Sequence, residues 1–232
     1  MRALLLSAGL GIRLRPITNA LPKCLVPIKG KPLLDYWLEM LNSAGVFPIL
    51  INLHFFPEKV ESYVQNSRFR KIIKTVLEEN LLGTGGTLLK NRAFFEDEPL
   101  MLVHADNLSK FDVKMFIERH QKRPPLCEIT MMTFHSPTPQ SCGIVELDER
   151  DIVRAFHEKV LHPPGNLANG AVYIIEPSVF HFLENIGKEV IDFSTEVLPH
   201  YVGKTFTFHN GEYHRDIGTI ESYEQALKDF HE

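Results

Sequence analysis

In the first half of the chain, short apolar runs alternate with segments in which apolar residues recur at helical spacing. Leu34, Trp37, Leu38 and Leu41 stand at i, i+3, i+4 and i+7, a pattern that predicts an amphipathic helix. The predicted strands are Arg2–Ser7, Phe47–Asn52, Ile73–Leu77 and Leu100–Val103, and the predicted helices begin after Pro32, at Pro57 and at Gly83. Strands that alternate with helices indicate a parallel sheet joined by helical crossovers.

The second half has more strand patterns and fewer helices between them. The predicted strands are Glu128–Phe134, Gly143–Leu147, Ile152–Phe156, Ala171–Ile175 and Thr205–Phe208, and a helix is predicted over Ile220–Phe230. The segment Gln121–Pro125 is the best internal boundary, but no Gly-, Ser- or Pro-rich linker separates two domains. The pattern therefore predicts one mixed α/β domain over residues 1–232.

The composition is that of an ordinary globular protein and adds little that is specific. Of the 232 residues, 44% are hydrophobic and 23% are charged, and the net charge is −4, which argues against a broad nucleic-acid or membrane surface. Three cysteines without a metal-ligand spacing suggest reduced thiols and a cytoplasmic protein. We expect neither a signal peptide nor a membrane span, because the first apolar run ends at a glycine turn.

The glycine turn after the first strand is the first candidate for chemistry. Gly9 and Gly11 would let backbone N–H groups approach an anion, and Arg13 and Lys23 could neutralise phosphate oxygens. A plain strand-exit turn with solvated cations is the alternative. The turn is neither a dinucleotide-binding fingerprint, because Leu14 stands at the third glycine position, nor a P-loop.

A series of motifs along the chain resembles the sugar nucleotidyltransferase family. In chain order they are SAGLGIRLRPIT, LPKCLVPIKGKPLLDY, EENLLGTGGTL (from Glu78), VHADN (from Val103), GIVELDERDIVRAFHEK (from Gly143), NGAVY (from Asn169) and RDIGT (from Arg215). The chain departs from the family pattern at Ile12, Cys24 and Val160, where the family has Thr, Pro and Pro.

The resemblance implies a fold and a reaction. The fold would be a Rossmann-like, mainly parallel mixed sheet flanked by helices, glycosyltransferase-A-like and without a C-terminal β-helix. Residues 1–125 would form the nucleotide-binding half and 126–232 the sugar-binding half. The reaction would be sugar 1-phosphate plus NTP giving NDP-sugar and pyrophosphate. It needs Mg²⁺ and fixed cations rather than a protein nucleophile, because the attacking phosphate oxygen is already anionic.

The resemblance also assigns roles to residues. The catalytic residues would be Arg13, Lys23 and Asp106, and the metal ligands Asp106 and Asp216. Nucleotide binding would involve Ser7, Ala8, Gly9, Gly11, Arg13, Glu78, Gly83, Thr84 and Gly86. The sugar phosphate would be bound by Gly143, Glu158, Lys159 and Asn169.

Several alternatives stay open at this stage. The LGTGG segment resembles that of the mannose- and heptose-1-phosphate guanylyltransferases more than that of the thymidylyltransferases, and this resemblance implies GTP with a mannose or heptose 1-phosphate. The alternative is UTP with N-acetylmuramic acid 1-phosphate or another hexose 1-phosphate. A catalytically inactive sensor of a nucleotide or sugar is a third hypothesis. It is disfavoured because the charged residues that the family's enzymes need are all present: Arg13, Lys23, Asp106, Lys159 and Asp216. A nicotinamide-dependent dehydrogenase is disfavoured by the incomplete fingerprint, and His209 and His214 are predicted as surface histidines. The partners would be small molecules, with no nucleic acid and no membrane, and whether the chain forms a homo-oligomer is left open.

Overall fold

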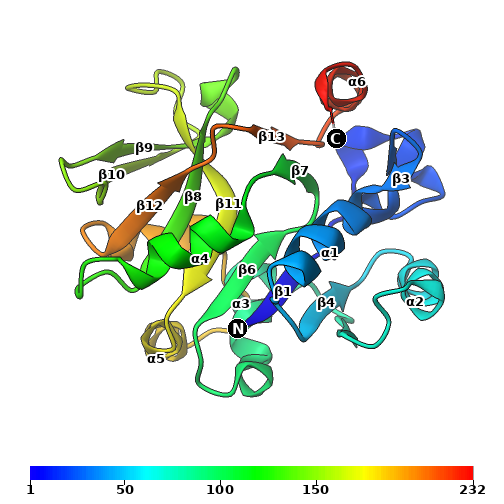
Figure 1. The fold of residues 1–232 in the computed structure, drawn as a ribbon, viewed down its shortest axis with the longest axis horizontal. Helices are drawn as coiled ribbons and strands as arrows, with labels where there is room; N and C mark the ends of the chain where they lie inside the picture. The colour runs from blue at the N-terminus through cyan, green and yellow to red at the C-terminus, as the bar shows by residue number, and fades with distance from the viewer. Residues whose placement is uncertain (232) are drawn as a thin grey trace. The chain divides into compact units, whose positions relative to one another are not determined.

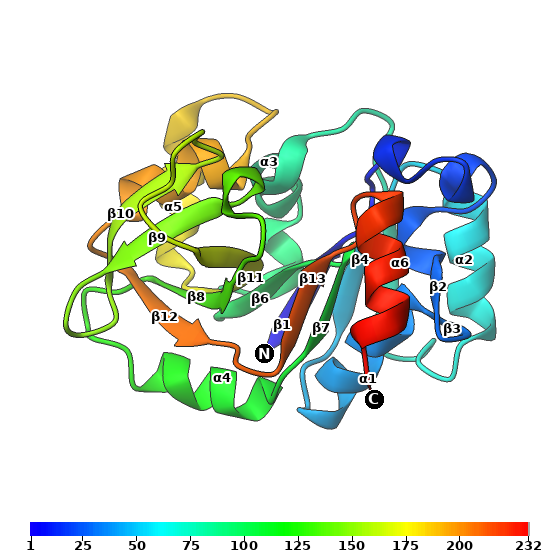
Figure 2. The ribbon, with the colours of Figure 1, turned by 90° about the horizontal axis from the view of Figure 1, so that it is seen from above.

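The computed structural model describes residues 1–231 and divides into two compact units (Figures 1 and 2). The first unit contains Met1–Leu81, Val103–Val113 and the stretch from Glu212 onward. The second contains Leu82–Leu102 and Lys114–Gly211. Strand β6 (Leu100–His104) lies where the chain passes from the second unit back to the first.

The first unit is built on three parallel strands in the order β1, β4, β5. Ala3 pairs with Ile49 and Ile49 with Ile73, and every residue of β4 is buried. Helix α1 buries the four apolar residues whose spacing predicted it. The elements are β1 (Arg2–Leu6), β2 (Pro27–Ile28), β3 (Lys31–Pro32), α1 (Leu33–Ser43), β4 (Ile49–Leu53), α2 (Pro57–Asn66) and β5 (Ile73–Leu77).

A two-stranded antiparallel ribbon and the last helix complete this unit. Strands β7 (Asn107–Lys110) and β13 (Tyr213–Asp216) pair so that Asp216 lies opposite Asn107. Helix α6 (Ile220–Asp229) begins at Thr219, whose hydroxyl accepts a hydrogen bond from the Ser222 amide. Leu108 of β7 and Ala226 of α6 belong to one buried apolar cluster, so the helix and the ribbon share a core.

The second unit is a five-stranded part of the sheet with helices on both faces. The strand order is β10, β9, β11, β8, β12, with antiparallel pairs except for the parallel pair of β8 and β12. Phe116 of α4 packs on Phe208 of β12, and Phe193 packs on Tyr173 of β11. The elements are α3 (Gly83–Lys90), α4 (Val113–Gln121), β8 (Ile129–His135), β9 (Gly143–Leu147), β10 (Val153–Glu158), β11 (Leu167–Ile175), α5 (Ser178–Ile186), a π-helical turn (Phe193–Val197) and β12 (Thr205–His209).

The expected fold class, a mixed and mainly parallel sheet flanked by helices, is confirmed. The sequence pattern missed α4, α5 and the β7–β13 ribbon. The single domain over 1–232, with halves at 1–125 and 126–232, stays a prediction.

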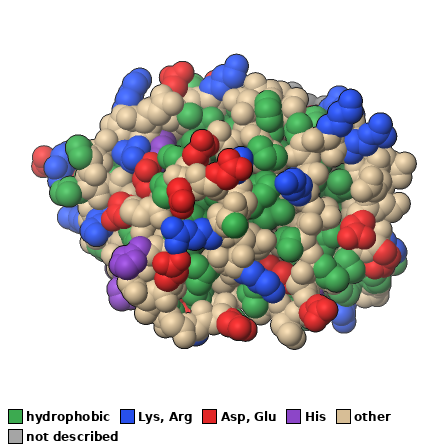
Figure 3. All heavy atoms as spheres, turned by 90° about the horizontal axis from the view of Figure 1, so that it is seen from below, with side chains coloured by type: hydrophobic (Ala, Val, Ile, Leu, Met, Phe, Trp, Pro, Cys, Tyr) green, Lys and Arg blue, Asp and Glu red, His purple; other side chains and the backbone are tan. Residues whose placement is uncertain are grey.

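The surface and the helices bear on two further expectations. On the face shown in Figure 3, Lys and Arg side chains are interspersed with Asp and Glu, as a net charge of −4 suggests. Among the helices that the structure describes, none has the length and apolar character needed to cross a membrane.

A buried histidine makes the stability of the second unit sensitive to pH. His120 Nδ1 lies 2.7 Å from Thr130 Oγ1, and its Nε2 lies 2.9 Å from Glu176 Oε1. Burial and the charge of Arg123 lower the pKa of His120, and the opposing effect of Glu176 does not cancel them. The native protein therefore keeps this imidazole neutral at a pH at which an unfolded chain would protonate it.

We expect the free energy of unfolding to fall as the pH drops below about 6.5, the pKa of an unfolded histidine, by up to about 1.4 kcal/mol per pH unit. The sign follows from the lowered pKa, because the stabilisation is complete above the unfolded pKa and is lost as the pH falls toward the folded one. Urea unfolding at pH 7.0 and 5.5 measures the slope. His120→Gln should reduce it, whereas His181→Gln, at an exposed position on α5, should leave it unchanged. An equal slope in wild type and His120→Gln would contradict the assignment.

Candidate active site

The glycine turn that follows β1 is fixed from behind by a buried threonine. Gly11 has a φ of +62°, and a Cβ there would lie 2.9 Å from Thr18 Cγ2. The Thr18 hydroxyl, on a fully buried residue, donates to the Gly11 carbonyl at 2.7 Å. A Cβ added at Gly9 would meet no atom within 4 Å, so the outer side of the turn is open. The turn thus has a fixed backbone and an unobstructed outer side, as a phosphate-binding loop requires.

A carboxamide from β4 holds the start of the turn. The Ser7 amide donates to Asn52 Oδ1 at 2.8 Å, and the Ser7 hydroxyl donates to the Asn52 carbonyl at 2.9 Å. Asn52 Nδ2 donates in turn to Glu78 Oε1 at 3.3 Å. Ser7, Ala8 and Glu78 are all buried, so the Glu78 side chain supports the turn from within the unit. Their predicted roles in nucleotide binding stay predictions.

Two carboxylates that are far apart in the sequence converge on one ammonium group. Lys23 Nζ lies 2.8 Å from Asp106 Oδ2 and 3.1 Å from Asp216 Oδ1. The Lys23 side chain is 7% exposed, whereas those of Asp106 and Asp216 are 37% and 55% exposed. The ammonium is therefore held inside the unit while both carboxylates keep a surface open to solvent.

The backbone explains why these two carboxylates meet. The Ala105 amide donates to the Leu6 carbonyl at 3.0 Å, which sets Asp106 beside the end of β1 and the start of the glycine turn. The pairing of β7 with β13 brings Asp216 next to it. A Cβ on Gly218 would lie 2.5 Å from Asp216 Oδ2, so the glycine of the RDIGT motif leaves room for the carboxylate.

The charges in this group stabilise one another. Burial would lower the pKa of Lys23, but Asp106 and Asp216 raise it above its ordinary value. Burial would raise the pKa of Asp106, but the charges of Lys23 and His104 and the hydrogen bond from Lys23 hold it below its ordinary value. At neutral pH Lys23 is therefore an ammonium and Asp106 an ionised carboxylate.

Arg13 and Cys24 are neighbours of the charged group formed by Lys23 and the two carboxylates. Arg13 NH2 lies 3.9 Å from Asp216 Oδ2 with its side chain 71% exposed, so this ion pair is weak and the guanidinium can turn to a ligand. Burial raises the pKa of the Cys24 thiol to about 12, which keeps it protonated. The chemistry available here is therefore that of fixed cations and carboxylates.

The side chains that could hold a metal ion are Asp106 and Asp216. Mg²⁺ takes oxygen ligands, and one or two carboxylates suffice when phosphate and water complete the octahedron. Because both carboxylates reach the same ammonium nitrogen, their oxygens lie close enough together to share one cation. Within residues 1–231, no group of three or more His, Cys, Asp or Glu side chains is arranged to hold a metal, and a two-carboxylate Mg²⁺ set does not need one.

The glycines at the start of α3 have a packing role in the second unit. A Cβ on Gly83 would lie 2.5 Å from the Ile191 carbonyl oxygen, and one on Gly86 would lie 2.2 Å from that of Glu189. The Thr84 hydroxyl accepts a hydrogen bond from the Phe193 amide at 2.7 Å. The backbone of residues 189–193 lies so close to the start of α3 that only glycine fits at positions 83 and 86. The predicted contact of Gly83, Thr84 and Gly86 with the nucleotide stays a prediction.

The four residues predicted for the sugar phosphate all lie in the second unit. Lys159 Nζ lies 3.3 Å from Glu158 Oε1. A Cβ on Gly143 would lie 2.6 Å from Glu158 Oε2, so this carboxylate lies directly over the glycine. Asn169 Nδ2 donates to Tyr173 Oη at 2.7 Å, and Asn169 Oδ1 accepts from the Ala171 amide at 2.9 Å. The Glu158 carboxylate and the Phe156 ring, whose Cζ would lie 2.7 Å from such a Cβ, thus occupy the space over Gly143.

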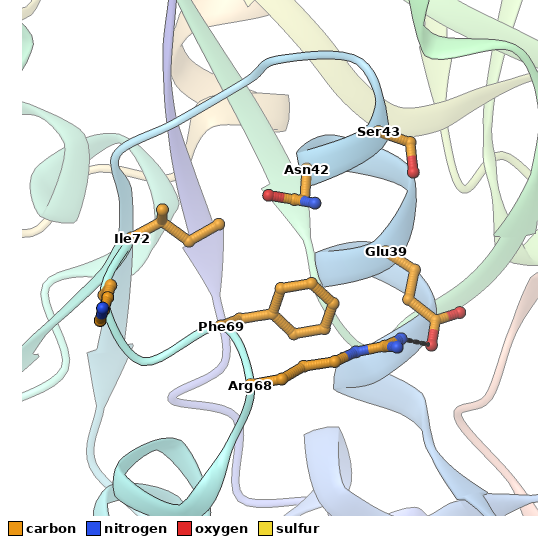
Figure 4. Close-up of a pocket in the computed structure, with 7 residues that line it drawn as sticks. Glu39, Asn42, Ser43, Arg68, Phe69 and Ile72 are labelled. Atoms are coloured by element: carbon orange, nitrogen blue, oxygen red, sulfur yellow. Dashed lines mark hydrogen bonds and ion pairs between the residues drawn. The ribbon is translucent and has the colours of Figure 1, made fainter.

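A hollow of about 350 Å³ in the first unit is a separate feature (Figure 4). It lies where α1 ends and just before β5 begins, and Arg68 and Glu39 form an ion pair on its wall. None of the predicted site residues lines it; its lining residues are Glu39, Asn42, Ser43, Arg68, Phe69, Lys71 and Ile72.

A comparison against protein families identifies the family of this chain. The model of the family described as nucleotidyl transferase matches residues 2–232. The chain belongs to this family. The predicted membership of a nucleotidyltransferase family is thus confirmed.

Relatives from several organisms are similar to the chain over nearly its whole length. It is 30% identical to a UTP–glucose-1-phosphate uridylyltransferase of Synechocystis sp., over 98% of this chain and 63% of that protein. It is also 30% identical to a mannose-1-phosphate guanylyltransferase of Mycobacterium tuberculosis, over 98% and 64%. The chain thus spans slightly less than two thirds of the length of these two relatives. For a D-glycero-alpha-D-manno-heptose 1-phosphate guanylyltransferase of Aneurinibacillus thermoaerophilus, the identity is 30% over 99% of this chain and 98% of that protein.

Solved structures show the same fold at lower identity. A putative glucose-1-phosphate thymidylyltransferase from Bacillus anthracis superposes with a TM-score of 0.88 at 17% identity, over 100% of this chain and 97% of that chain. HddC from Yersinia pseudotuberculosis gives 0.82 at 24% identity, over 99% of both chains. At these identities the likeness speaks for the fold alone.

Two residues with a structural role at the site were missed in the sequence. Asn52 lies at the end of β4, 45 residues from the Ser7 amide that it holds. Thr18 is the last residue of the SAGLGIRLRPIT segment, and this place in the motif was the available signal. Its burial is seen only in the structure. His214 was predicted as a surface histidine, but it is only partly exposed, and its Nδ1 lies 2.5 Å from Ser109 Oγ. That prediction is wrong for His214, because pairing of β13 with β7 turns its ring toward Ser109.

Proposed function

We propose that this chain transfers a nucleoside monophosphate from an NTP, with GTP favoured, to a sugar 1-phosphate of the mannose or heptose type. A phosphate oxygen of the sugar 1-phosphate attacks the α-phosphorus, the bond from that phosphorus to the β-phosphate oxygen breaks, and pyrophosphate leaves. The observation that supports this most is the convergence of Asp106 and Asp216 on Lys23, beside a glycine turn with an open outer side.

The residues of the first unit would act on charge and position. Backbone amides of the glycine turn and the Arg13 guanidinium would bind the triphosphate, and Lys23 would hold both carboxylates in position. Asp106 and Asp216 would hold Mg²⁺, and the chemistry that the ion supplies when bound is neutralisation of charge on phosphate oxygens. No side chain has to act as a nucleophile.

The residues of the second unit would bind the other substrate. Lys159 has an exposed side chain and would pair with the phosphate of the sugar 1-phosphate. Glu158 would accept hydrogen bonds from ring hydroxyls and Asn169 would donate to them, and the missing side chain of Gly143 leaves room for the Glu158 carboxylate.

The choice of GTP is supported by the LGTGG segment and by two relatives named as guanylyltransferases. A uridylyltransferase is the second candidate, because another relative of similar identity carries that name. A panel of four NTPs against mannose, heptose, glucose and N-acetylmuramic acid 1-phosphates, scored by pyrophosphate release, tests the proposal. Release with GTP and mannose or heptose 1-phosphate above all other pairs supports it, and release with no pair contradicts it.

We expect Lys159→Ala to raise the KM for sugar 1-phosphate about tenfold or more while raising the KM for the NTP much less, because one charge-assisted contact to phosphate is lost. Initial rates at varied concentrations of each substrate measure both constants. Lys204→Ala is the matched control, since Lys204 also has an exposed side chain with a carboxylate at 3.3 Å, that of Glu128. Equal increases for both substrates would assign Lys159 to something other than the sugar phosphate.

A further inference from the structure

Three buried polar side chains lie behind the glycine turn of the first unit. Ser7 follows β1, Asn52 stands near the end of β4, and Glu78 follows β5. Because these three strands are parallel neighbours in the order β1, β4, β5, the three residues lie next to one another at the carboxyl edge of the sheet. Buried polar groups are nearly always hydrogen-bonded, so the contacts among these side chains are part of how the edge is built.

The Asn52 carboxamide links the other two residues in a fixed direction. Its Oδ1 accepts a hydrogen bond from the Ser7 amide at 2.8 Å, and its Nδ2 donates to Glu78 Oε1 at 3.3 Å. The backbone amide can only donate, so the oxygen of the carboxamide faces Ser7 and the nitrogen faces Glu78. Two partners of opposite kind therefore fix the orientation of this side chain.

The Glu78 end of this chain of hydrogen bonds is anchored by the backbone. The Glu78 amide donates to the Leu53 carbonyl at 2.8 Å, and the Glu78 carbonyl oxygen lies 2.7 Å from His54 Nδ1. Both of these partners directly follow Asn52 in the sequence. Glu78 is thus tied to the same stretch of chain that carries the carboxamide it contacts.

At the other end, the carboxamide holds an amide that no strand partner holds. Leu6 is the last residue of β1 that pairs with β4, and the next amide, that of Ser7, is bound by the Asn52 side chain instead. The glycine turn begins at this point, and Thr18 holds its far end through the Gly11 carbonyl. The backbone N–H groups between these two anchors are those that would bind the triphosphate, so a shift of Ser7 would displace them.

We infer that Asn52 and Glu78 are positioning residues for the triphosphate: Glu78 orients the Asn52 carboxamide, which fixes the Ser7 amide and with it the glycine turn. The inference rests on the proposed function, since it concerns how the phosphate-binding turn of that site is held. It gives Glu78, which the resemblance assigned to nucleotide binding, an indirect role that acts through Asn52.

Reversing the hydrogen bond between Asn52 and Glu78 tests the inference. Asn52→Asp keeps the size of the side chain but sets a second carboxylate against that of Glu78, so the Kd for the nucleotide should rise about tenfold or more. Adding Glu78→Gln lets the new carboxamide donate to the new carboxylate, which still accepts from the Ser7 amide. The double variant has the charge of the wild type, and its Kd should return to within about twofold of the wild-type value.

Equilibrium dialysis with GTP and, in parallel, with UTP, at a fixed Mg²⁺ concentration, measures the Kd. In turnover, the KM for mannose 1-phosphate should change by less than about twofold in both variants, whereas a general loss of structure would affect both substrates. The matched control is Asn66→Asp, at an exposed position of the first unit where Nδ2 donates to the Ser62 carbonyl at 2.8 Å. It should change the Kd by less than about twofold.

Circular dichroism establishes that each variant is folded. If Asn52→Asp does not fold, Asn52→Ala replaces it, because it removes the acceptor of the Ser7 amide without adding a charge, and its Kd should rise as well. A wild-type Kd in Asn52→Asp or Asn52→Ala would overturn the inference. So would a double variant that binds the nucleotide no better than Asn52→Asp.

Binding and turnover together separate this inference from the proposed function. Loss of nucleotide binding in Asn52→Asp and its return in the double variant, without pyrophosphate release from any sugar 1-phosphate, would support the positioning role and refute the reaction. Pyrophosphate release with an unchanged Kd in Asn52→Asp would support the reaction and refute the positioning role. A wild type that neither binds these nucleotides nor releases pyrophosphate would overturn both.

Discussion

Asp106→Asn is expected to lower the rate of pyrophosphate release by a factor of about 10² to 10³ while leaving the fold intact. The substitution keeps the size of the side chain but removes one of the two negative charges that face Lys23 and a bound cation. A preorganised electrostatic contact of this kind accounts for about 2.7–4 kcal/mol of transition-state stabilisation in enzymes. Initial rates at saturating NTP and sugar 1-phosphate, over a range of Mg²⁺ concentrations, measure the loss.

The variant separates loss of chemistry from loss of structure. Lys23 keeps a carboxylate partner in Asp216 at 3.1 Å, so circular dichroism at 25 °C should match that of the wild type. Asp97→Asn is the control, because it removes an equally simple carboxylate that pairs with Arg92 at 3.2 Å in the other unit. A rate close to that of the wild type at saturating Mg²⁺ would remove Asp106 from the proposed metal site.

The local pattern of apolar and polar residues was enough to predict the helices and strands in which buried positions recur at a regular spacing. The boundaries of β5 and β9 agree with the prediction residue by residue, because each strand is bounded by turn residues. The β7–β13 ribbon could not be predicted in this way. Tyr213–Asp216 is short and polar, and it becomes a strand only because β7 pairs with it and α6 packs against it. Its structure is dictated by contacts that are distant in the sequence.

The same limit applies to the candidate site. Residue types and spacing gave the glycine turn and its neighbouring cations, but they could not join Asp106 to Asp216, which stand 110 positions apart in the sequence. That pair came from the resemblance to a family, and the structure supplies the physical reason in the register of β13 with β7.

Lys23 is the residue that both carboxylates of the charged group contact, so its replacement should disturb this group more than any other single substitution. In Lys23→Met the side chain stays long and apolar enough to fill the buried space, but two carboxylates are left without the ammonium between them. Like charges at this distance raise the pKa of one carboxylate, the opposite of the lowered pKa that Asp106 has in the wild type.

We expect Lys23→Met to lower pyrophosphate release at least as much as Asp106→Asn, and to make folding depend more strongly on Mg²⁺. A carboxylate whose folded pKa is raised favours the native state only at low pH, so the variant should lose thermal stability relative to the wild type as the pH rises above about 4, the pKa of an unfolded aspartate. A ligand that binds only the native state, at a concentration one hundred times its Kd, adds about 2.7 kcal/mol to the free energy of unfolding. We expect the gain from Mg²⁺ to be larger in Lys23→Met than in the wild type.

Thermal unfolding at pH 5 and 8, with and without Mg²⁺, measures this effect without any turnover. Lys31→Met is the matched control, because Lys31 also pairs with a carboxylate in the first unit, at 2.9 Å from Glu39, but lies outside the charged group. If Mg²⁺ stabilised Lys23→Met, Lys31→Met and wild type equally, the ammonium and the metal ion would not share the two carboxylates. A larger gain in Lys23→Met alone would mean that a divalent ion can take over part of what Lys23 does, which is the electrostatic basis of the proposed reaction.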